Sequence, residues 1–241
     1  VAPPYSQESF VFGTRVQLSI WGAPEAQAKQ AASAVMADLD RLHVKLHAWK
    51  PGPLTQLNQA LASSREPQAI DAEMAQLLTL SQNYAARSDQ LFNPAIGKLV
   101  SAWGFHADQF VPHRPDQATL AKLLSAAPSM ADLIVTATSV ANRNPSLQLD
   151  FGGVAKGWAL DREINYLQQH GIRNALLNIG GNVRAIGKKG GEAWRVGLQH
   201  PRKSEPMAWL ELNNGEAIGT SGDYQRYFEL DGQRYCHLLD P

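Results

Sequence analysis

Apolar residues recur at every second position from Phe10 to Trp21 and at every third or fourth position after Pro24. A period of two is typical of a half-buried strand, so we expect one opening strand over Phe10–Trp21, around Gly13. The wider spacing predicts a helix that begins at Pro24 and turns one apolar stripe toward the core. That stripe consists of Ala28, Ala31, Ala32, Val35, Leu39 and Leu42.

Similar patterns predict the remaining elements. Two more helices are expected over Asp71–Ser88, with Asp71 as the N-cap, and over Pro115–Ala126. β-branched and apolar runs predict strands over Leu133–Val140 and Leu147–Phe151, and a helix follows over Ala155–Gln169 with Gly171 at its C-terminal cap. The rest of the chain contains short predicted strands at 175–179, 183–186, 194–198, 209–212 and 224–230.

The order of these elements is one strand, several helices, and then mostly strands with one long helix. This order suits an α+β fold better than regular βαβ alternation. We find no internal repeat, low-complexity tract or linker, so a single domain over residues 1–241 is expected. A chain of this length buries an ample core, and its single cysteine, Cys236, excludes a disulfide-rich scaffold and a four-cysteine zinc site.

Charge and hydropathy argue against two classes of function, nucleic-acid binding and membrane spanning. The chain carries 22 Lys and Arg against 22 Asp and Glu, which argues against a basic track for nucleic acid. No apolar run approaches the roughly 20 residues that span a bilayer, and the start at Val1 lacks the features of a signal peptide. We therefore expect a soluble chain, compatible with the mature part of an exported precursor.

The segment with the clearest chemistry is LDFGGVAKGWA, from Leu149 to Ala159. Its glycines allow close approach to a ligand, a helix N-terminus presents unpaired N–H groups, and Lys156 adds a positive charge. These features predict a phosphate site in which Asp150 holds a cation or a ligand hydroxyl. The alternative is an ordinary strand-to-helix turn with a solvated lysine. The spacings of a Walker loop and of a dinucleotide fingerprint are both absent.

Three other segments share this density of glycine, asparagine, threonine and aromatic residues. They are FNPAIGKLV from Phe92, LNIGGN from Leu177 and GTSGDY from Gly219. Exposed main-chain groups at such edges can bind a flat, phosphorylated ligand, although each segment alone is also typical of a tight turn.

Together with FGT at residues 12–14 and HLLDP at residues 237–241, these segments resemble the FAD:protein FMN transferase family, of the ApbE type. The resemblance extends over nearly the whole chain. It implies one ApbE-like α+β domain with mixed or antiparallel sheets and packed helices. It also implies that the protein binds FAD with Mg²⁺, transfers the FMN half to a threonine or serine hydroxyl of a partner protein, and releases AMP.

The resemblance further implies the partners and the location. Acceptors are expected to be flavoprotein subunits of bacterial membrane electron-transport complexes. The expected location is the cell envelope, on the periplasmic side, with membrane attachment only through a lipid anchor of the precursor.

The same resemblance assigns the site residues. Trp49 is expected to stack on a flat ring of the ligand, with a core tryptophan as an equal alternative. Phe12 stands where the family usually has methionine, and the main-chain oxygen of Gly153 is expected to coordinate the metal. The residues expected to contact the ligand are Phe12, Trp49, Lys50, Pro51, Ala95, Ile96, Gly97, Asp150, Lys156 and Leu238.

The resemblance implies that His237 is the residue nearest to the reacting atoms. An imidazole with an ordinary pKa near 6.5 can accept the proton of an attacking hydroxyl, or it can simply orient a phosphate. His43 and His47 have the i, i+4 spacing of a zinc pair on a helix, but without the glutamate of H-E-x-x-H they are expected to be a surface pair.

The resemblance also implies a longer chain, in which a later aspartate and threonine supply side-chain metal ligands. We therefore expect truncation at Pro241 and assign no side-chain ligand to the metal. Two other functions remain open. One is an FAD-binding protein that stores or delivers flavin, and the other is an FAD pyrophosphatase that yields FMN and AMP.

Overall fold

The computed structural model describes residues 3–239, which form two compact units. The first unit comprises the chain up to His43 together with Ala155–Gly222, and the second comprises Val44–Val154 together with the chain from Asp223 onward. Each unit combines two stretches that are distant in sequence, so neither can be cut out as one continuous segment. The single domain expected over residues 1–241 stays a prediction.

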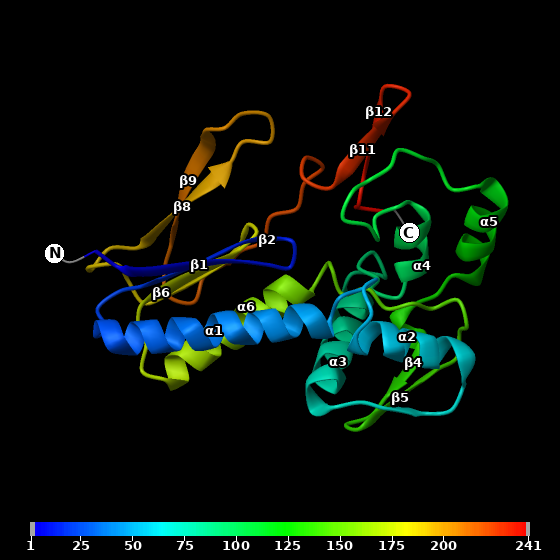
Figure 1. Ribbon diagram of the computed structural model, residues 1–241, viewed down its shortest axis with the longest axis horizontal. Helices are drawn as coiled ribbons and strands as arrows, with labels where there is room; N and C mark the ends of the chain where they lie inside the picture. The colour runs from blue at the N-terminus through cyan, green and yellow to red at the C-terminus, as the bar shows by residue number, and fades with distance from the viewer. Residues whose placement is uncertain (1–2, 240–241) are drawn as a thin grey trace. The chain divides into compact units, whose positions relative to one another are not determined.

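The first unit is built on a five-stranded antiparallel sheet of order β1-β2-β6-β7-β10. Helices α1 (Glu25–Lys45) and α6 (Ala155–Gln169) cover one face of this sheet (Figure 1). The two helices supply most residues of the apolar core between them and the sheet. A separate antiparallel pair, β8 with β9, completes the unit. The strands are β1 (Tyr5–Val11), β2 (Thr14–Ile20), β6 (Ala175–Ile179), β7 (Asn182–Ile186), β8 (Trp194–Gln199), β9 (Pro206–Leu212) and β10 (Ala217–Ile218).

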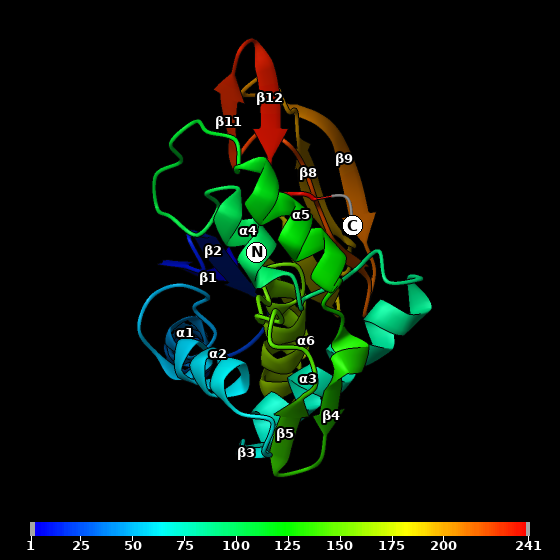
Figure 2. The same cartoon turned by 90° about the vertical axis from the view of Figure 1, so that its right-hand side faces the viewer.

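The second unit is mainly helical. Figure 2 shows α2 and α3 near a small sheet of order β3-β5-β4, and the β11–β12 hairpin well apart from that sheet. The helices are α2 (Pro53–Ser63), α3 (Ala72–Arg87), α4 (Gly97–Ala102) and α5 (Gln117–Ala126), with a 3₁₀ turn η1 (Met130–Asp132). The strands are β3 (Gln68–Ala69), β4 (Leu133–Val135), β5 (Ser139–Asn142), β11 (Tyr227–Leu230) and β12 (Gln233–Cys236). Helices with antiparallel sheets confirm the predicted α+β class.

The long helices follow the prediction closely. All six residues of the expected stripe on α1 are buried, and α6 has the predicted bounds. Asp71 caps α3 by accepting a hydrogen bond from the N–H of Met74, and Gly171 has the positive φ of a C-terminal cap.

The prediction of one continuous opening strand is wrong, because the chain reverses at Phe12 and Gly13. Both residues have positive φ, 55° and 67°, which is the geometry of a two-residue hairpin turn. The reversal joins β1 to β2 and resets the alternation, so Phe10 is 72% exposed while Val11 is buried.

Two more strand predictions are wrong. The run over Leu133–Val140 is split into β4 and β5 by a turn in which the hydroxyl of Thr136 hydrogen-bonds with Ser139. The run over Leu147–Phe151 is extended, but its only β-bridge among the described residues joins Gln148 to Ile96. Helix α2 was not predicted, although its buried residues Leu54, Asn58 and Leu61 lie on one face.

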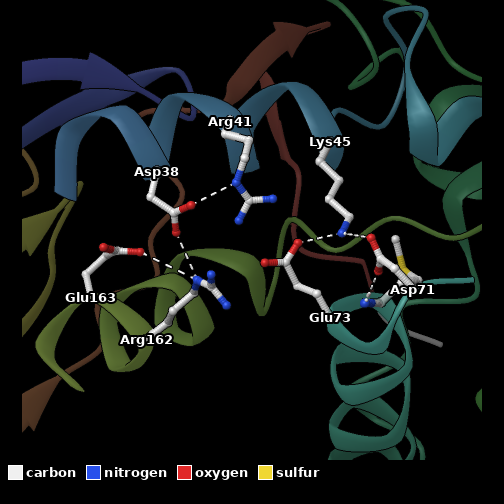
Figure 3. Close-up of polar contacts among 8 residues, drawn as sticks. Asp38, Arg41, Lys45, Asp71, Glu73, Arg162 and Glu163 are labelled. Carbon is white, nitrogen blue, oxygen red and sulfur yellow. Dashed lines mark hydrogen bonds and ion pairs between the residues drawn. The ribbon is translucent and has the colours of Figure 1, made fainter. Parts of the chain in front are cut away.

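Ion pairs lie along α1 (Figure 3). Near its middle, Asp38 accepts hydrogen bonds from Arg41 and from Arg162 of α6. At its end, Lys45 pairs with Asp71 and Glu73 at the start of α3. Among residues 3–239, no helix has both the length and the apolar character that crossing a membrane requires.

Candidate functional site

The second unit brings Trp49, His106 and Asp150 together. The Nε2 atom of His106 lies 2.8 Å from Oδ2 of Asp150. The imidazole also stacks on the indole of Trp49, with a centroid separation of 5.4 Å and an angle of 21° between the rings. The result is one connected group of an aromatic ring, an imidazole and a carboxylate.

Asn58 of α2 holds the chain next to Asp150 in place. Its amide donates to the carbonyl of Leu149 at 2.9 Å, and its side-chain oxygen accepts from the Leu149 N–H at 2.8 Å. The Asp150 N–H in turn donates to the carbonyl of Pro94 at 2.9 Å. The peptide group between Leu149 and Asp150 is therefore held at both its carbonyl and its N–H.

The predicted main-chain stretch Ala95–Gly97 runs beside this segment. The Gln148 N–H donates to the carbonyl of Ala95, and the Gly97 N–H donates to the carbonyl of Gln148 at 2.8 Å. A Cβ atom on Gly97 would lie 2.7 Å from that same carbonyl oxygen, so only glycine permits this approach. The structure thus places Ala95–Gly97 beside the extended segment that carries Asp150.

The carboxyl of Asp150 is ionised. Burial alone would raise its pKa, but the hydrogen bonds from His106 and from the Gly152 N–H, with the charge of Arg226, outweigh burial and hold the pKa below its ordinary value. Since an ionised carboxylate only accepts hydrogen bonds, Nε2 of His106 carries the proton in this pair.

Arg226 approaches the same group from the chain before β11. Its guanidinium donates to the carbonyl of Phe105 at 2.8 Å and lies 5.8 Å from the ring centre of Trp49. Burial lowers the pKa of Arg226, and the charge of Asp150 offsets part of that effect. The carbonyl of Arg226 lies 3.2 Å from both the N–H and Nδ1 of His237. Arg226 therefore links the predicted His237 to the aromatic pair.

A cleft of about 610 Å³ opens beside Trp49 and His106. Its volume suits a small-molecule ligand, and its lining mixes apolar surface with amide, hydroxyl and amine groups. It is lined by Ala48, Trp49, Pro51, Gly52, Thr55, Gln56, Asn58, Gln59, Ala62, Lys98, Ser101, His106, Leu147 and Gln148. Of the predicted contact residues, Trp49 and Pro51 are in this lining, so Trp49 is a cleft residue rather than a core tryptophan.

The other predicted contact residues are not in this lining. Lys50 pairs with Asp108 at 3.1 Å, and Leu238 is 52% exposed. Phe12 belongs to the first unit, where its ring meets the edge of His43. Lys156 also belongs to the first unit, on the first turn of α6. The four assignments stay predictions.

The metal site is not supported by the described donors. Within residues 3–239, no three His, Cys, Asp or Glu side chains form a group that could hold a metal ion. Gly153 offers only its carbonyl oxygen, and a Cβ there would lie 3.3 Å from the ring of Phe92. These residues do not fit Mg²⁺, which prefers near-octahedral oxygen ligands. Asp240 lies outside the described residues.

His43 and His47 do not lie on one helix, because α1 ends at Lys45, and both side chains are partly exposed. Beyond that end, Nδ1 of His47 accepts hydrogen bonds from the N–H groups of Trp49 and Lys50. His47 therefore shapes the loop that carries Trp49.

Sequence reasoning missed three residues of the site: Asn58, His106 and Arg226. Arg226 lies two residues after the GTSGDY segment, outside the predicted motif. The contacts of all three residues join positions more than 40 apart in the chain, and no local pattern encodes such contacts.

Comparisons with known proteins identify the family of this chain. Residues 12–241 match the ApbE family. The chain is 43% identical to a protein of Rhodobacter capsulatus named FAD:protein FMN transferase, over all of this chain and 46% of that protein. It is 33% identical to a protein of the same name from Klebsiella pneumoniae, over 98% of this chain and 72% of that one.

A solved structure shows the same fold. The crystal structure of the ApbE protein from Thermotoga maritima superposes with a TM-score of 0.88 at 28% identity, covering 98% of this chain and 76% of that one. The chain spans about half the length of the Rhodobacter capsulatus relative.

Proposed function

The chain belongs to the ApbE family, and on that premise we propose that it transfers the FMN half of FAD to a threonine or serine hydroxyl of a partner flavoprotein. The observation that carries the proposal is the cleft of the second unit, which Trp49 and His106 line as a pair of stacked rings, with His106 also hydrogen-bonded to the ionised carboxylate of Asp150. A flat, polar nucleotide needs this combination of stacking and hydrogen bonding.

The proposed reaction is a phosphoryl-type transfer. The acceptor oxygen forms a bond to the phosphorus on the FMN side, and the bond from that phosphorus to the bridging oxygen breaks, so AMP leaves with that oxygen. His237 takes the proton of the hydroxyl, and the positive charge of Arg226, whose carbonyl contacts His237, lies nearby. Trp49 and the Ala95–Gly97 backbone bind the nucleotide.

Asp150 takes a different role from the one that a phosphate site suggests. Its carboxylate would repel a diphosphate, and each of its oxygens already accepts a hydrogen bond, one from His106 and one from Gly152. Its remaining lone pairs suit a ligand hydroxyl or ring N–H. We therefore assign Asp150 to a donor group of the nucleotide and not to the diphosphate.

Magnesium dependence stays a prediction, and no step is assigned to the ion. It is tested by following AMP release with Mg²⁺ and after chelation.

The acceptors we propose are flavoprotein subunits of bacterial membrane electron-transport complexes. We place the protein on the periplasmic side of the cell envelope, attached only through a lipid anchor of its precursor. Fractionation of cells that express the full-length protein tests this location.

The central experiment mixes the purified chain with FAD and Mg²⁺ and follows AMP with and without an acceptor peptide. AMP that appears only with the peptide supports transfer. AMP without the peptide indicates a pyrophosphatase, and FAD binding without AMP indicates a storage protein. Either result contradicts the proposal.

Two variants test the roles. Asp150→Ala should weaken FAD binding by about tenfold or more, because it removes the ionised acceptor that pairs with His106 of the cleft. His237→Ala should lower the transfer rate more than it lowers FAD affinity, because it removes the proton acceptor. Wild-type flavinylation rates in both variants would contradict these assignments.

A further inference from the structure

We infer that His106 is a positioning residue that sets Asp150 and Trp49 in one fixed geometry for the nucleotide. The inference rests on the proposed function for the identity of the ligand, FAD. It concerns a residue outside the motifs that the family resemblance identified.

The backbone around His106 is anchored before its side chain makes any contact. The preceding residue, Phe105, is fully buried, and its N–H donates to the carbonyl of Val100 at 3.1 Å. The Phe105 carbonyl accepts from Arg226 at 2.8 Å. The chain therefore presents the imidazole from a held position rather than from a mobile loop.

One edge of the imidazole holds Asp150. The two side chains are only 6% and 16% exposed, so the bond from Nε2 to the carboxylate is shielded from water. A hydrogen bond to an ionised, shielded acceptor is stronger than one between neutral groups. With Gly152 on the other oxygen, both ends of the carboxylate are fixed, and its plane is set before a ligand arrives.

One face of the same imidazole supports Trp49. The two rings are nearly parallel, and both line the cleft of about 610 Å³. The edge-on contact of His47, at 4.5 Å and 77°, restrains Trp49 further. Loss of the imidazole would free both the indole ring and the carboxylate, so His106 couples the two groups expected to bind the nucleotide.

Three substitutions separate the two contacts. His106→Gln keeps an N–H donor at the reach of Nε2 but loses the ring. His106→Phe keeps a ring for Trp49 but loses the donor. His106→Ala loses both. The control is His113→Phe, since His113, like His106, hydrogen-bonds through Nε2 and stacks on an aromatic ring, here Phe228, but does not line the cleft.

The readouts are the Kd for FAD by titration calorimetry and the transfer rate at saturating FAD. We expect His106→Phe to weaken FAD binding by about tenfold or more, because it unpairs a shielded carboxylate, and His106→Gln to stay within about threefold of wild type. His106→Ala should be at least as weak as His106→Phe. Transfer at saturating FAD should stay within about threefold in all of them, because His106 acts on binding and not on the reacting phosphorus.

The inference is overturned if His106→Phe binds FAD as wild type does, or if His106→Gln binds as weakly as His106→Ala. It is also overturned if His113→Phe weakens binding equally, which would indicate a general loss of packing. Failure of the proposed function gives a different result: wild type binds FAD but transfers no FMN, and the binding comparison still decides the role of His106. Absence of FAD binding in wild type would overturn both.

A further measurement observes the wild-type protein directly and uses a variant only to assign the signal. Histidine-selective ¹⁵N NMR, assigned through the spectrum of His106→Gln, should show a protonated Nε2 at His106. An unprotonated Nε2 would contradict the hydrogen bond to Asp150.

Discussion

Glu163→Gln should change how the stability of this protein depends on pH. Glu163 lies on α6 with a side chain that is 2% exposed; its Oε1 lies 3.8 Å from Nε of Arg162 (Figure 3) but accepts no hydrogen bond from the described residues. Burial, together with the hydrogen bond to Asp38 and the charge of that residue, raises its pKa to about 8, against the opposing charges of Arg162 and Arg41. The folded protein therefore holds a proton on Glu163 at neutral pH.

That proton sets the direction of the effect. The unfolded chain releases it above the ordinary value of 4.5, whereas the folded protein keeps it up to about pH 8. The native state then binds more protons than the unfolded state, so stability falls as pH rises between those values, by about 1.4 kcal/mol per pH unit. Between roughly pH 5 and pH 7.5 the loss amounts to about 3 kcal/mol.

Glutamine cannot ionise and should remove this loss. Urea denaturation at constant ionic strength measures the free energy of unfolding of both proteins across this range. The variant should gain about 3 kcal/mol relative to wild type between roughly pH 5 and pH 7.5, with no further gain above about pH 8. The control is Glu205→Gln, at an exposed carboxyl just before β9, whose difference from wild type should stay flat. A flat difference for Glu163→Gln as well would refute the reasoning.

Three further changes test the packing. Gly97→Ala should lower the free energy of unfolding by about 2 kcal/mol in urea denaturation and weaken FAD binding, because the added Cβ meets the Gln148 carbonyl. Gly157→Ala, at a helical position where a Cβ meets nothing within 4 Å, should instead raise stability by about 0.5–1 kcal/mol. Equal effects of the two would contradict the close approach at Gly97. Lys45→Met should cost about 1–2 kcal/mol and reduce the salt dependence of the melting temperature, since it removes two ion pairs; an unchanged salt dependence would contradict their contribution.

Helices could be predicted well where their bounds and caps depend on residues close together in the sequence. The apolar stripe of α1 and the bounds of α6 follow from periodicity, and the cap at Asp71 follows from the choice of residue. The strand predictions failed where the chain turns at residues that themselves fit a strand pattern. Phe12–Gly13 continues the alternation of its neighbours, and Thr136 is β-branched like the residues of β4, yet both lie in turns. Propensity describes single residues, whereas a turn depends on hydrogen bonds between them.

The candidate site was predicted in part. Asp150 and Ala95–Gly97 were chosen from their motifs, and the structure joins them through three backbone hydrogen bonds. His106 and Asn58 could not be found in this way, because a histidine or an asparagine becomes informative only when its partner is known. The role expected for Asp150, to hold a cation or a ligand hydroxyl, stays a prediction; its hydrogen bonds from His106 and Gly152 leave it suited to a donor group and not to a phosphate.

The α+β class, the long amphipathic helices and membership of the ApbE family follow from the order of residues alone, because periodicity and motif order are properties of neighbouring residues. The contact of His106 with Asp150 and the proton on Glu163 follow only from the folded arrangement. The reason is that hydrogen bonds and pKa shifts depend on distance and burial. Those quantities arise only when residues far apart in the chain are packed together, away from water.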